Sequence, residues 1–320
     1  MVKTPNRTQP KISVLIPCYN EEQTIAKVIN DFRRELPHAD IYVFDNNSQD
    51  ATASLAAENG AIVVKEKRQG KGHVINSMFT DVVSDIYVMV DGDDTYPASS
   101  VHELIAPVVN EEADMVVGQR LSSYTEGAFP PLHVLGNKLV CSLVNSVFST
   151  NLKDPMSGYR AFNRKVTMQC PVVATGFDVE TEMTLQLLYR HLKITEVEIN
   201  YRERPAGSYS KLRTFSDGLK VINKIFSIIP SYKPLTFFGG ISLGLVVISL
   251  FVGSFVIREY IQYQYIYSVP KAVLATGLML FAGILLAVGI ILHVLNFRLL
   301  EESNNNQKMF SLLDRSLREK

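Results

Sequence analysis

The chain has 320 residues, and its 32 lysines and arginines balance 32 aspartates and glutamates, so the formal net charge is zero. This balance supplies no basic excess of the kind that nucleic-acid binding needs, so we expect no nucleic-acid partner. The three cysteines, Cys18, Cys141 and Cys170, lack the spacing of a zinc or redox motif, and we expect buried thiols in a reducing compartment.

Apolar segments of strand length alternate with helical patterns over the first part of the chain, after a polar N-terminus in which no signal peptide is expected. The expected strands are residues 12–17, 41–45, 61–65, 86–91 and 115–119. The expected helices between them are residues 21–35, 50–59, 72–83 and 99–110. This alternation predicts an α/β domain with a mainly parallel, Rossmann-like sheet. Ligands bind beyond the carboxyl ends of the strands in such sheets, and polar residues follow the expected strands there.

Asp91 and Asp93 stand two residues apart where the fourth expected strand ends. One carboxylate can contact a nucleotide ribose and the other a hard divalent cation, because the glycine between them lets the backbone turn closely. Mg²⁺ or Mn²⁺ prefers carboxylate oxygens together with ligand phosphates. The first strand is not followed by Gly-x-Gly-x-x-Gly, and the chain has no Walker phosphate loop, so neither a dinucleotide cofactor nor an ATPase is indicated.

Five motifs follow one another in the sequence. They are IPCYNE at 16–21, FDNNSQDAT at 44–52, RQGKG at 68–72, VDGDD at 90–94 and DPMSGYR at 154–160. With these motifs, residues 11 to 211 resemble the large inverting glycosyltransferase family with a GT-A fold, which includes dolichyl-phosphate mannose synthase and bacterial polyprenyl-phosphate glucosyltransferases. The sequence departs from the family pattern at Asn46-Asn47, where many members have Asp-Gly.

The resemblance implies a nucleotide-sugar donor, with UDP-glucose expected first and mannose or an aminopentose as the alternative sugar. The residues implied at the nucleotide sugar are Pro17, Tyr19, Glu21, Asp45, Lys71 and Asp91. Those implied at Mg²⁺ or Mn²⁺ are Asp91, Asp93 and Gln119. Those implied in catalysis are Asp91, Asp93, Asp154, Glu180 and Glu182. Either Glu180 or Glu182 is expected to orient the acceptor, and charge balance for Arg160 or Arg190 is the alternative.

The expected acceptor is a polyprenyl phosphate, undecaprenyl phosphate in bacteria. A lipid monophosphate is already mostly ionised at neutral pH, since its second pKa is about 6. Such an acceptor needs cations more than a general base. The candidate cations are Arg120, Lys138, Arg202, Arg204 and Lys211, of which the last three lie in a segment resembling the family's Arg-x-x-Gly-x-Ser-Lys. Plain surface solvation is the alternative for Lys138.

Two uncharged apolar segments, residues 235–257 and 272–292, each exceed the roughly 20 residues of a membrane-spanning helix. We expect a transmembrane hairpin of helices at about 235–257 and 272–295. The segments before the first span and after the second contain more lysines and arginines than the loop between the spans. This bias predicts that both ends of the hairpin face the cytoplasm. Residues 215–229 have an apolar stripe that suits an interfacial helix or a core-facing one. The expected division is 1–211 catalytic, 212–233 juxtamembrane, 234–298 transmembrane and 299–320 cytoplasmic tail.

These features predict an integral protein of the bacterial inner membrane with a cytoplasmic catalytic domain, and association into a homo-oligomer stays open. A processive polysaccharide synthase is the nearest enzyme alternative, but such enzymes use a Gln-x-x-Arg-Trp motif and this chain has no tryptophan. A non-catalytic membrane scaffold with the same fold is an alternative of a different class. The retained pattern of Asp91, Asp93 and Arg202 argues against a scaffold.

Overall fold

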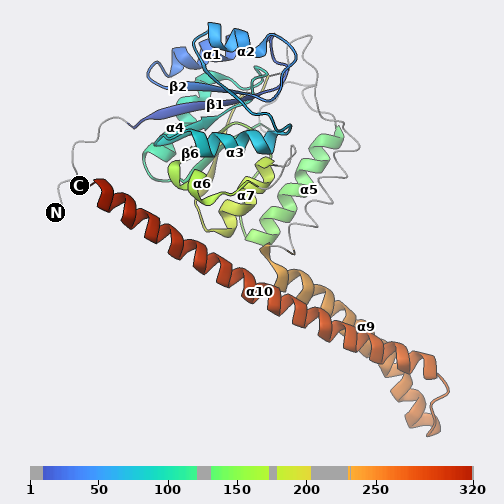
Figure 1. Cartoon of the computed structure of the whole chain (residues 1–320). Helices are drawn as coiled ribbons and strands as arrows, with labels where there is room; N and C mark the ends of the chain where they lie inside the picture. The colour runs from blue at the N-terminus through green and yellow to red at the C-terminus, as the bar shows by residue number, and fades with distance from the viewer. Residues whose placement is uncertain (1–9, 121–130, 173–178, 203–229, 231, 319–320) are drawn as a thin grey trace. The chain divides into compact units, whose positions relative to one another are not determined.

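The structure is a computed structural model, and it describes residues 10–120, 131–172, 179–202, 230 and 232–318. The chain divides into two compact units, Met1–Val221 and Ile222–Lys320. The first unit holds a twisted sheet covered by helices, and the second holds two long helices (Figure 1).

The first unit is built on a sheet of seven described strands. They are β1 (Ile12–Cys18), β2 (Asp40–Asp45), β3 (Ile62–Lys65), β4 (Ile86–Met89), β5 (Met115–Gln119), β6 (Arg160–Asn163) and β7 (Ile194–Glu198). Their order across the sheet is β3-β2-β1-β4-β6-β5-β7. β6 runs antiparallel to β4 and β5, and the other pairings are parallel. The carboxyl ends of β1, β2, β4 and β5 therefore meet at one edge, and the predicted mainly parallel α/β fold is confirmed.

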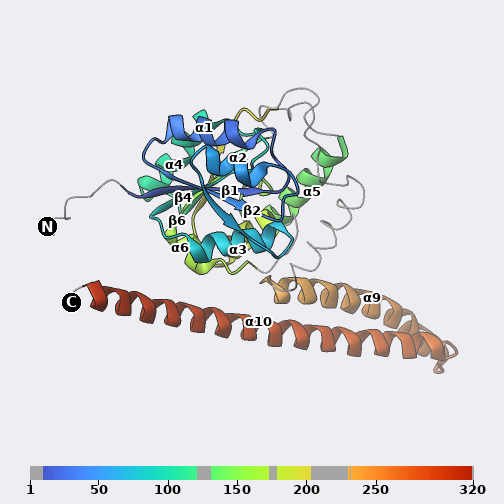
Figure 2. The same cartoon turned by 45° about the horizontal axis from the view of Figure 1, so that its top comes forward.

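Helices cover both faces of this sheet, as Figures 1 and 2 show. One face carries α1 (Ile25–Glu35), α2 (Thr52–Glu58) and, after a short 3₁₀ turn at Ala98–Ser100, α4 (Val101–Val109). The other face carries α3 (Lys71–Asp81), α6 (Arg164–Gln169) and α7 (Val179–Tyr189). α5 (Pro131–Phe148) packs against α7.

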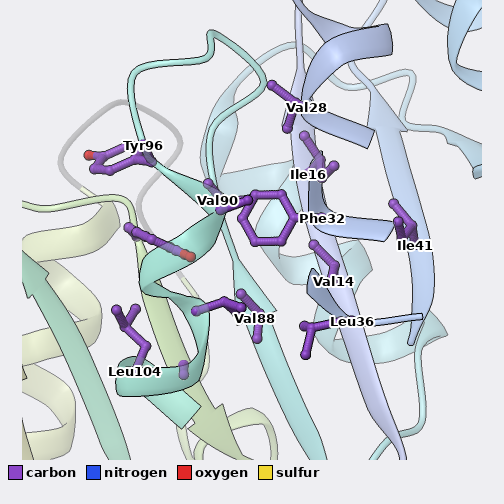
Figure 3. Close-up of a cluster of buried hydrophobic side chains, with 14 of the residues drawn as sticks. Val14, Ile16, Val28, Phe32, Leu36, Ile41, Val88, Val90, Tyr96 and Leu104 are labelled. Atoms are coloured by element: carbon purple, nitrogen blue, oxygen red, sulfur yellow. The ribbon is translucent and has the colours of Figure 1, made fainter. Parts of the chain in front are cut away.

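Alternation along β1 explains the two cores of this unit. Val14 and Ile16 face the cluster under α1 and α4, whereas Leu15 faces the cluster under α3 and α7. Phe32 of α1 lies beside Val14 and Val90 in the first cluster (Figure 3), and it is almost fully buried. Burying such a side chain contributes about 1.5–3 kcal/mol. These cores hold the strand ends, and so the polar residues that follow them, in fixed positions.

The predicted strands and helices up to residue 119 are all present, with boundary shifts of at most four residues. β4 ends at Met89 and not at residue 91, because residues 92 and 93 turn out of the sheet. α1 begins at Ile25 and not at residue 21, since the preceding residues form the loop that follows β1. The sequence patterns do not predict the later elements α5, β6, α6, α7 and β7.

The second unit is a hairpin of α9 (Pro234–Tyr263) and α10 (Val269–Arg318). The Ser242 hydroxyl donates to the Ala282 carbonyl at 2.8 Å, and the Ser249 hydroxyl donates to the Ala275 carbonyl at 2.7 Å. These bonds join the two helices in antiparallel pairing along their apolar parts. The expected amphipathic segment 215–229 lies outside the described residues.

Both helices are long and apolar enough to cross a membrane, with window hydropathies of 2.4 and 2.7. Only 17% and 11% of these windows are buried within the described structure, unlike the core helices of soluble proteins. α9 runs past the apolar segment to Tyr263, because no proline interrupts it before Gln264 adopts a left-handed conformation at φ 54°. The loop is consequently shorter than the expected 258–271.

Candidate active site

The loops that follow β1 and β2 are joined by side chains that bond backbone amides. The Ser48 hydroxyl accepts from the Asn20 amide at 3.0 Å, and the Thr52 hydroxyl accepts from the Glu21 amide at 2.8 Å. Asp45, which is buried at the end of β2, accepts from the Ser48 amide at 3.2 Å. The predicted nucleotide-contact residues of the first two motifs therefore belong to one connected pair of loops.

Pro17 and Tyr19 belong to the same pair of loops. Pro17 is paired in register with Phe44 of β2, one residue before Asp45. Tyr19 follows the last residue of β1 and is exposed. A ring that is held by a fixed strand end and still faces solvent can pack against a flat ligand group.

Asn46 and Asn47, where the sequence departs from the family pattern, organise the next loop. The Asn46 side-chain amide donates to the carbonyls of Glu66 and Arg68 at 3.0 and 2.8 Å, and its oxygen accepts from the Gly70 amide at 2.8 Å. Asn47 has φ 63°, a left-handed conformation that asparagine tolerates better than most residues. Asn47 therefore suits a position where glycine is common, and Asn46 holds the loop that leads to α3.

Lys71 begins α3 and joins two carboxylates of the site. Its ammonium group lies 2.6 Å from Asp91 Oδ1 and 2.5 Å from Glu180 Oε1. Burial by itself would lower the pKa of Lys71, but Asp91 and Glu180 more than offset it, and the net shift is upward. The lysine therefore stays charged between its two partners.

Asp91 is also pressed against the motif at 154–160. A Cβ built on Gly158 would lie 2.7 Å from Asp91 Oδ2, so any side chain at this position would displace the carboxylate. The Gly158 amide donates to the Tyr96 hydroxyl at 3.1 Å, which fixes the glycine backbone. Glycine at this position therefore leaves room for the Asp91 carboxylate where it lies.

Asp93 and Arg202 are connected through Thr95. Asp93 is buried, and its Oδ1 accepts from the Thr95 hydroxyl at 2.6 Å. The Arg202 amide donates to the Thr95 carbonyl at 2.9 Å, while the Arg202 residue is exposed. The structure thus joins the backbone of a predicted acceptor residue to the loop of the predicted metal ligand. Gln119 lies buried at the end of β5, on the same edge.

Arg120 forms a bidentate ion pair with Asp154. Arg120 Nε lies 2.8 Å from Asp154 Oδ2, and an Arg120 terminal nitrogen lies 2.9 Å from Oδ1. Burial would lower the pKa of Arg120, but Asp154 raises it by more. Glu196 accepts from the Asp154 and Lys153 amides at 2.7 Å each, and burial raises the pKa of Glu196. Asp154 is therefore fixed from two sides.

Arg160 is fully buried and ties the 154–160 motif to α7. Its guanidinium donates to the carbonyls of Ser157 and Pro155 at 2.8 and 2.6 Å, and to the Thr184 hydroxyl at 3.0 Å. Burial lowers the pKa of Arg160. These bonds go to neutral oxygens, while the Glu180 charge partly offsets the effect of burial on Arg160, so charge balance by α7 stays an alternative for Glu180.

Two tyrosines complete the site, and sequence reasoning assigned neither of them a role. Tyr96 and Tyr201 have ring centroids 5.2 Å apart, and the guanidinium carbon of Arg120 lies 5.7 Å from the Tyr201 centroid. A cation over an aromatic face is attracted electrostatically. The sequence signal for Tyr96 was its place just after the Asp-x-Asp motif, and for Tyr201 its place next to Arg202.

Other predicted residues are less closely connected with this group. Lys138 lies exposed on α5. Glu182 is buried on α7 and accepts from the Gln186 side chain at 3.0 Å. Lys211, Arg204 and Asp178 fall outside the described residues. The roles predicted for all these residues stay predictions.

The donor atoms at this edge fit a hard divalent cation that also binds phosphate. Within the described ranges, no three His, Cys, Asp or Glu side chains gather into a metal-holding group. Asp91, Asp93 and Gln119 offer carboxylate and amide oxygens, which Mg²⁺ and Mn²⁺ accept when ligand phosphates complete the coordination. The arrangement therefore suits a cation that binds together with a diphosphate.

Comparisons with known proteins agree with this geometry. A family model described as Glycosyl transferase family 2 matches residues 13–170. Glycosyltransferase AglJ of Haloferax volcanii is 32% identical over 286 residues, which cover 89% of this chain and 92% of that protein. Dolichyl-phosphate hexose transferase of the same organism is 29% identical over 218 residues, covering 68% of this chain and 93% of that protein.

Solved structures with the same fold include an enzyme with its ligands bound. The glucosyl-3-phosphoglycerate synthase of Mycobacterium tuberculosis, in complex with Mn²⁺, UDP-glucose and phosphoglyceric acid, superposes with a TM-score of 0.56 at 25% identity. The match covers 68% of this chain and 79% of that structure.

Proposed function

Because this chain belongs to glycosyl transferase family 2, we propose that it transfers a hexose from a nucleotide sugar to the phosphate of a polyprenyl lipid at a membrane. UDP-glucose is the first assignment for the donor, and undecaprenyl phosphate is the first assignment for the acceptor. Mannose or an aminopentose is the alternative sugar. The relative named dolichyl-phosphate hexose transferase supports a lipid-phosphate acceptor.

The observation that carries this proposal is the gathering of carboxylates and cations at one sheet edge. The Lys71 ammonium group lies 2.6 Å from Asp91, and the Arg120 guanidinium lies 2.8 Å from Asp154. Carboxylates serve a donor that carries a metal-bound diphosphate, and arginines serve an anionic acceptor. A protein that only supported other membrane proteins would not need both kinds of group together.

The donor is assigned to the half of the site near β1, β2 and β4. Pro17, Tyr19, Glu21 and Asp45 would hold the nucleoside, and Lys71 would lie near the nucleotide. Asp91 would hold the ribose, and Asp93 with Gln119 would hold Mg²⁺ or Mn²⁺. When bound, the cation would neutralise charge on the departing diphosphate. The chain's own contribution is to orient the donor through loops whose amides are already bonded.

The acceptor phosphate is assigned to Arg120, Arg202 and Lys211, with Lys138 as a further candidate. Guanidinium groups pair with phosphate oxygens in a fork, which fixes the direction of the attacking oxygen. That oxygen forms a bond to the anomeric carbon as the bond to the donor diphosphate breaks. No general base is required, because the phosphate is already ionised. One displacement inverts the anomeric configuration.

Membrane attachment is assigned to α9 and α10, whose apolar surfaces are mostly exposed within the described structure. Such surfaces are stable when lipid covers them. Lysines and arginines on the outer flanks of the hairpin favour cytoplasmic ends. We assign residues 1–211 to the catalytic domain and 212–233 to the membrane surface, with the enzyme in a bacterial inner membrane.

The proposal is tested by incubating the purified full-length protein with undecaprenyl phosphate, MnCl₂ and one radiolabelled nucleotide sugar at a time. We expect label from UDP-glucose in the lipid fraction, with the anomeric configuration opposite to that of the donor. Label from another nucleotide sugar alone would replace the sugar assignment. Absence of lipid label with every donor, or retention of configuration, would contradict the proposed reaction.

Arg202→Ala is expected to slow transfer at least about tenfold, because a charge-assisted bond to phosphate contributes about 1.5–3 kcal/mol. The affinity for donor should change much less. Initial rates at several lipid concentrations measure the effect. Arg34→Ala serves as the matched control, since Arg34 lies in the last turn of α1 and pairs with Asp31 on the surface. Equal rates for Arg202→Ala and the control would remove Arg202 from the acceptor site.

A further inference from the structure

Lys71 connects three elements that are distant in the sequence. It is the first residue of α3, Asp91 follows β4, and Glu180 lies in the first turn of α7. Its ammonium group contacts Asp91 at 2.6 Å and Glu180 at 2.5 Å. The Glu180 side chain is only 6% exposed, whereas that of Asp91 is 28% exposed. Lys71 therefore links a buried carboxylate to one that remains open to a ligand.

The charges of this group are unequal. Asp91, Asp93 and Glu180 carry three formal negative charges. Lys71 contributes one positive charge, and the charge of Arg160 acts on Glu180 as well. The negative charge that remains suits a divalent cation bound with a diphosphate. Glu180 contacts the lysine ammonium group through Oε1.

The backbone of Glu180 is bonded to residues of the protein core. Its own carbonyl accepts from the Thr184 hydroxyl at 3.0 Å, and Thr184 accepts from the buried Arg160 at 3.0 Å. The position of Glu180 is thus set by the core and not by the exposed face of the site. A nearly buried carboxylate on a backbone held in this way can direct a flexible lysine side chain.

The Asp91 carboxylate is in contact on both of its oxygens. Its Oδ2 lies against Gly158, while its Oδ1 accepts from Lys71. The carboxylate is therefore clamped between a backbone surface and an ammonium group. The direction in which it faces a ligand depends on where Lys71 holds it.

We propose that Glu180 is a positioning residue that acts through Lys71 to orient the Asp91 carboxylate toward the donor. This inference rests on the proposed donor role of Asp91. It differs from the sequence expectation, in which Glu180 orients the acceptor directly. Glu180 then governs donor affinity, and its effect requires the lysine.

The test is a double-mutant cycle on the full-length protein in detergent, with UDP-glucose and MnCl₂ as the probe in calorimetric titrations. Glu180→Gln is expected to raise the donor Kd about fivefold in the otherwise unchanged protein, and less than about twofold in the Lys71→Met background. Glu180→Asp keeps the charge and should weaken binding less than Glu180→Gln. The KM for undecaprenyl phosphate should stay the same in Glu180→Gln.

The control is Asp114→Asn, which removes a carboxylate that pairs with Lys165 at 3.4 Å. Asp114 immediately precedes β5, at the opposite edge of the sheet from the site. Thermal unfolding of all variants identifies any loss of structure, and the Lys71→Met background keeps the comparison informative if Glu180→Gln is less stable. An equal loss of donor affinity with and without Lys71, or a raised lipid KM with unchanged donor Kd, would overturn the inference. A wild-type protein that binds no UDP-glucose would remove the donor assignment first, and this inference with it.

Discussion

Asp93→Asn is expected to lower the rate of sugar transfer at least about 100-fold, which corresponds to roughly 2.7 kcal/mol of transition-state stabilisation. The asparagine oxygen can still accept from the Thr95 hydroxyl, which Asp93 now bonds at 2.6 Å. The loop and the attached backbone of Arg202 should therefore keep their positions. What is lost is the negative charge that would hold Mg²⁺ or Mn²⁺ with the donor diphosphate. Excess EDTA should abolish transfer by the wild-type protein for the same reason.

Asp94→Asn is the matched control for this substitution. Asp94 is the next residue, and its carboxylate pairs with Lys27 at 2.6 Å. Asp94 has φ 58°, which asparagine also tolerates, so the control changes the charge without straining the backbone. Transfer rates with Mn²⁺ titrated from zero should separate the two variants. Undiminished transfer by Asp93→Asn, or by the wild type in excess EDTA, would contradict the metal assignment.

Arg120→Ala is expected to lower the free energy of unfolding by about 3–5 kcal/mol, because Asp154 would keep a buried charge without its ion-pair partner. The Asp154 side chain is 0% exposed, and that of Arg120 is 16% exposed, so solvent screens the pair only weakly. For a domain of this size, each kcal/mol shifts Tm by roughly 2–4 °C. Thermal unfolding in detergent should detect the change directly.

A second variant separates stability from function at this pair. Arg120→Met combined with Asp154→Asn removes both charges, so it should regain at least about half of the lost stability, because no buried charge is left unpaired. Transfer should stay low in the double variant if Arg120 binds the acceptor phosphate. An Arg120→Ala variant that unfolds at the wild-type temperature would show that the ion pair contributes little to stability. Full transfer by the double variant would remove Arg120 from the acceptor site.

The local patterns of the sequence predicted the first half of the fold because each element there has a clear period. Strands such as β1 alternate between two cores, and α1 presents one apolar face with Phe32 at its centre. β6 was missed because it is only four residues long and almost wholly buried, so it has no alternation to detect. Its antiparallel place between β4 and β5 depends on pairings between distant segments.

The sequence by itself predicted which side chains gather at the candidate site. Gln119 ends β5, and Asp91, Asp93 and Arg120 follow strands whose carboxyl ends share the same edge. It also determined the two apolar helices, because a long run of uncharged apolar residues can be read directly from the sequence. Only the tertiary structure decided which groups face one another. Lys71 meets Glu180, and Arg120 meets Asp154, across loops whose closure no periodic pattern encodes. Such partners are selected by packing and by the need to compensate buried charge, which act only once the chain has folded.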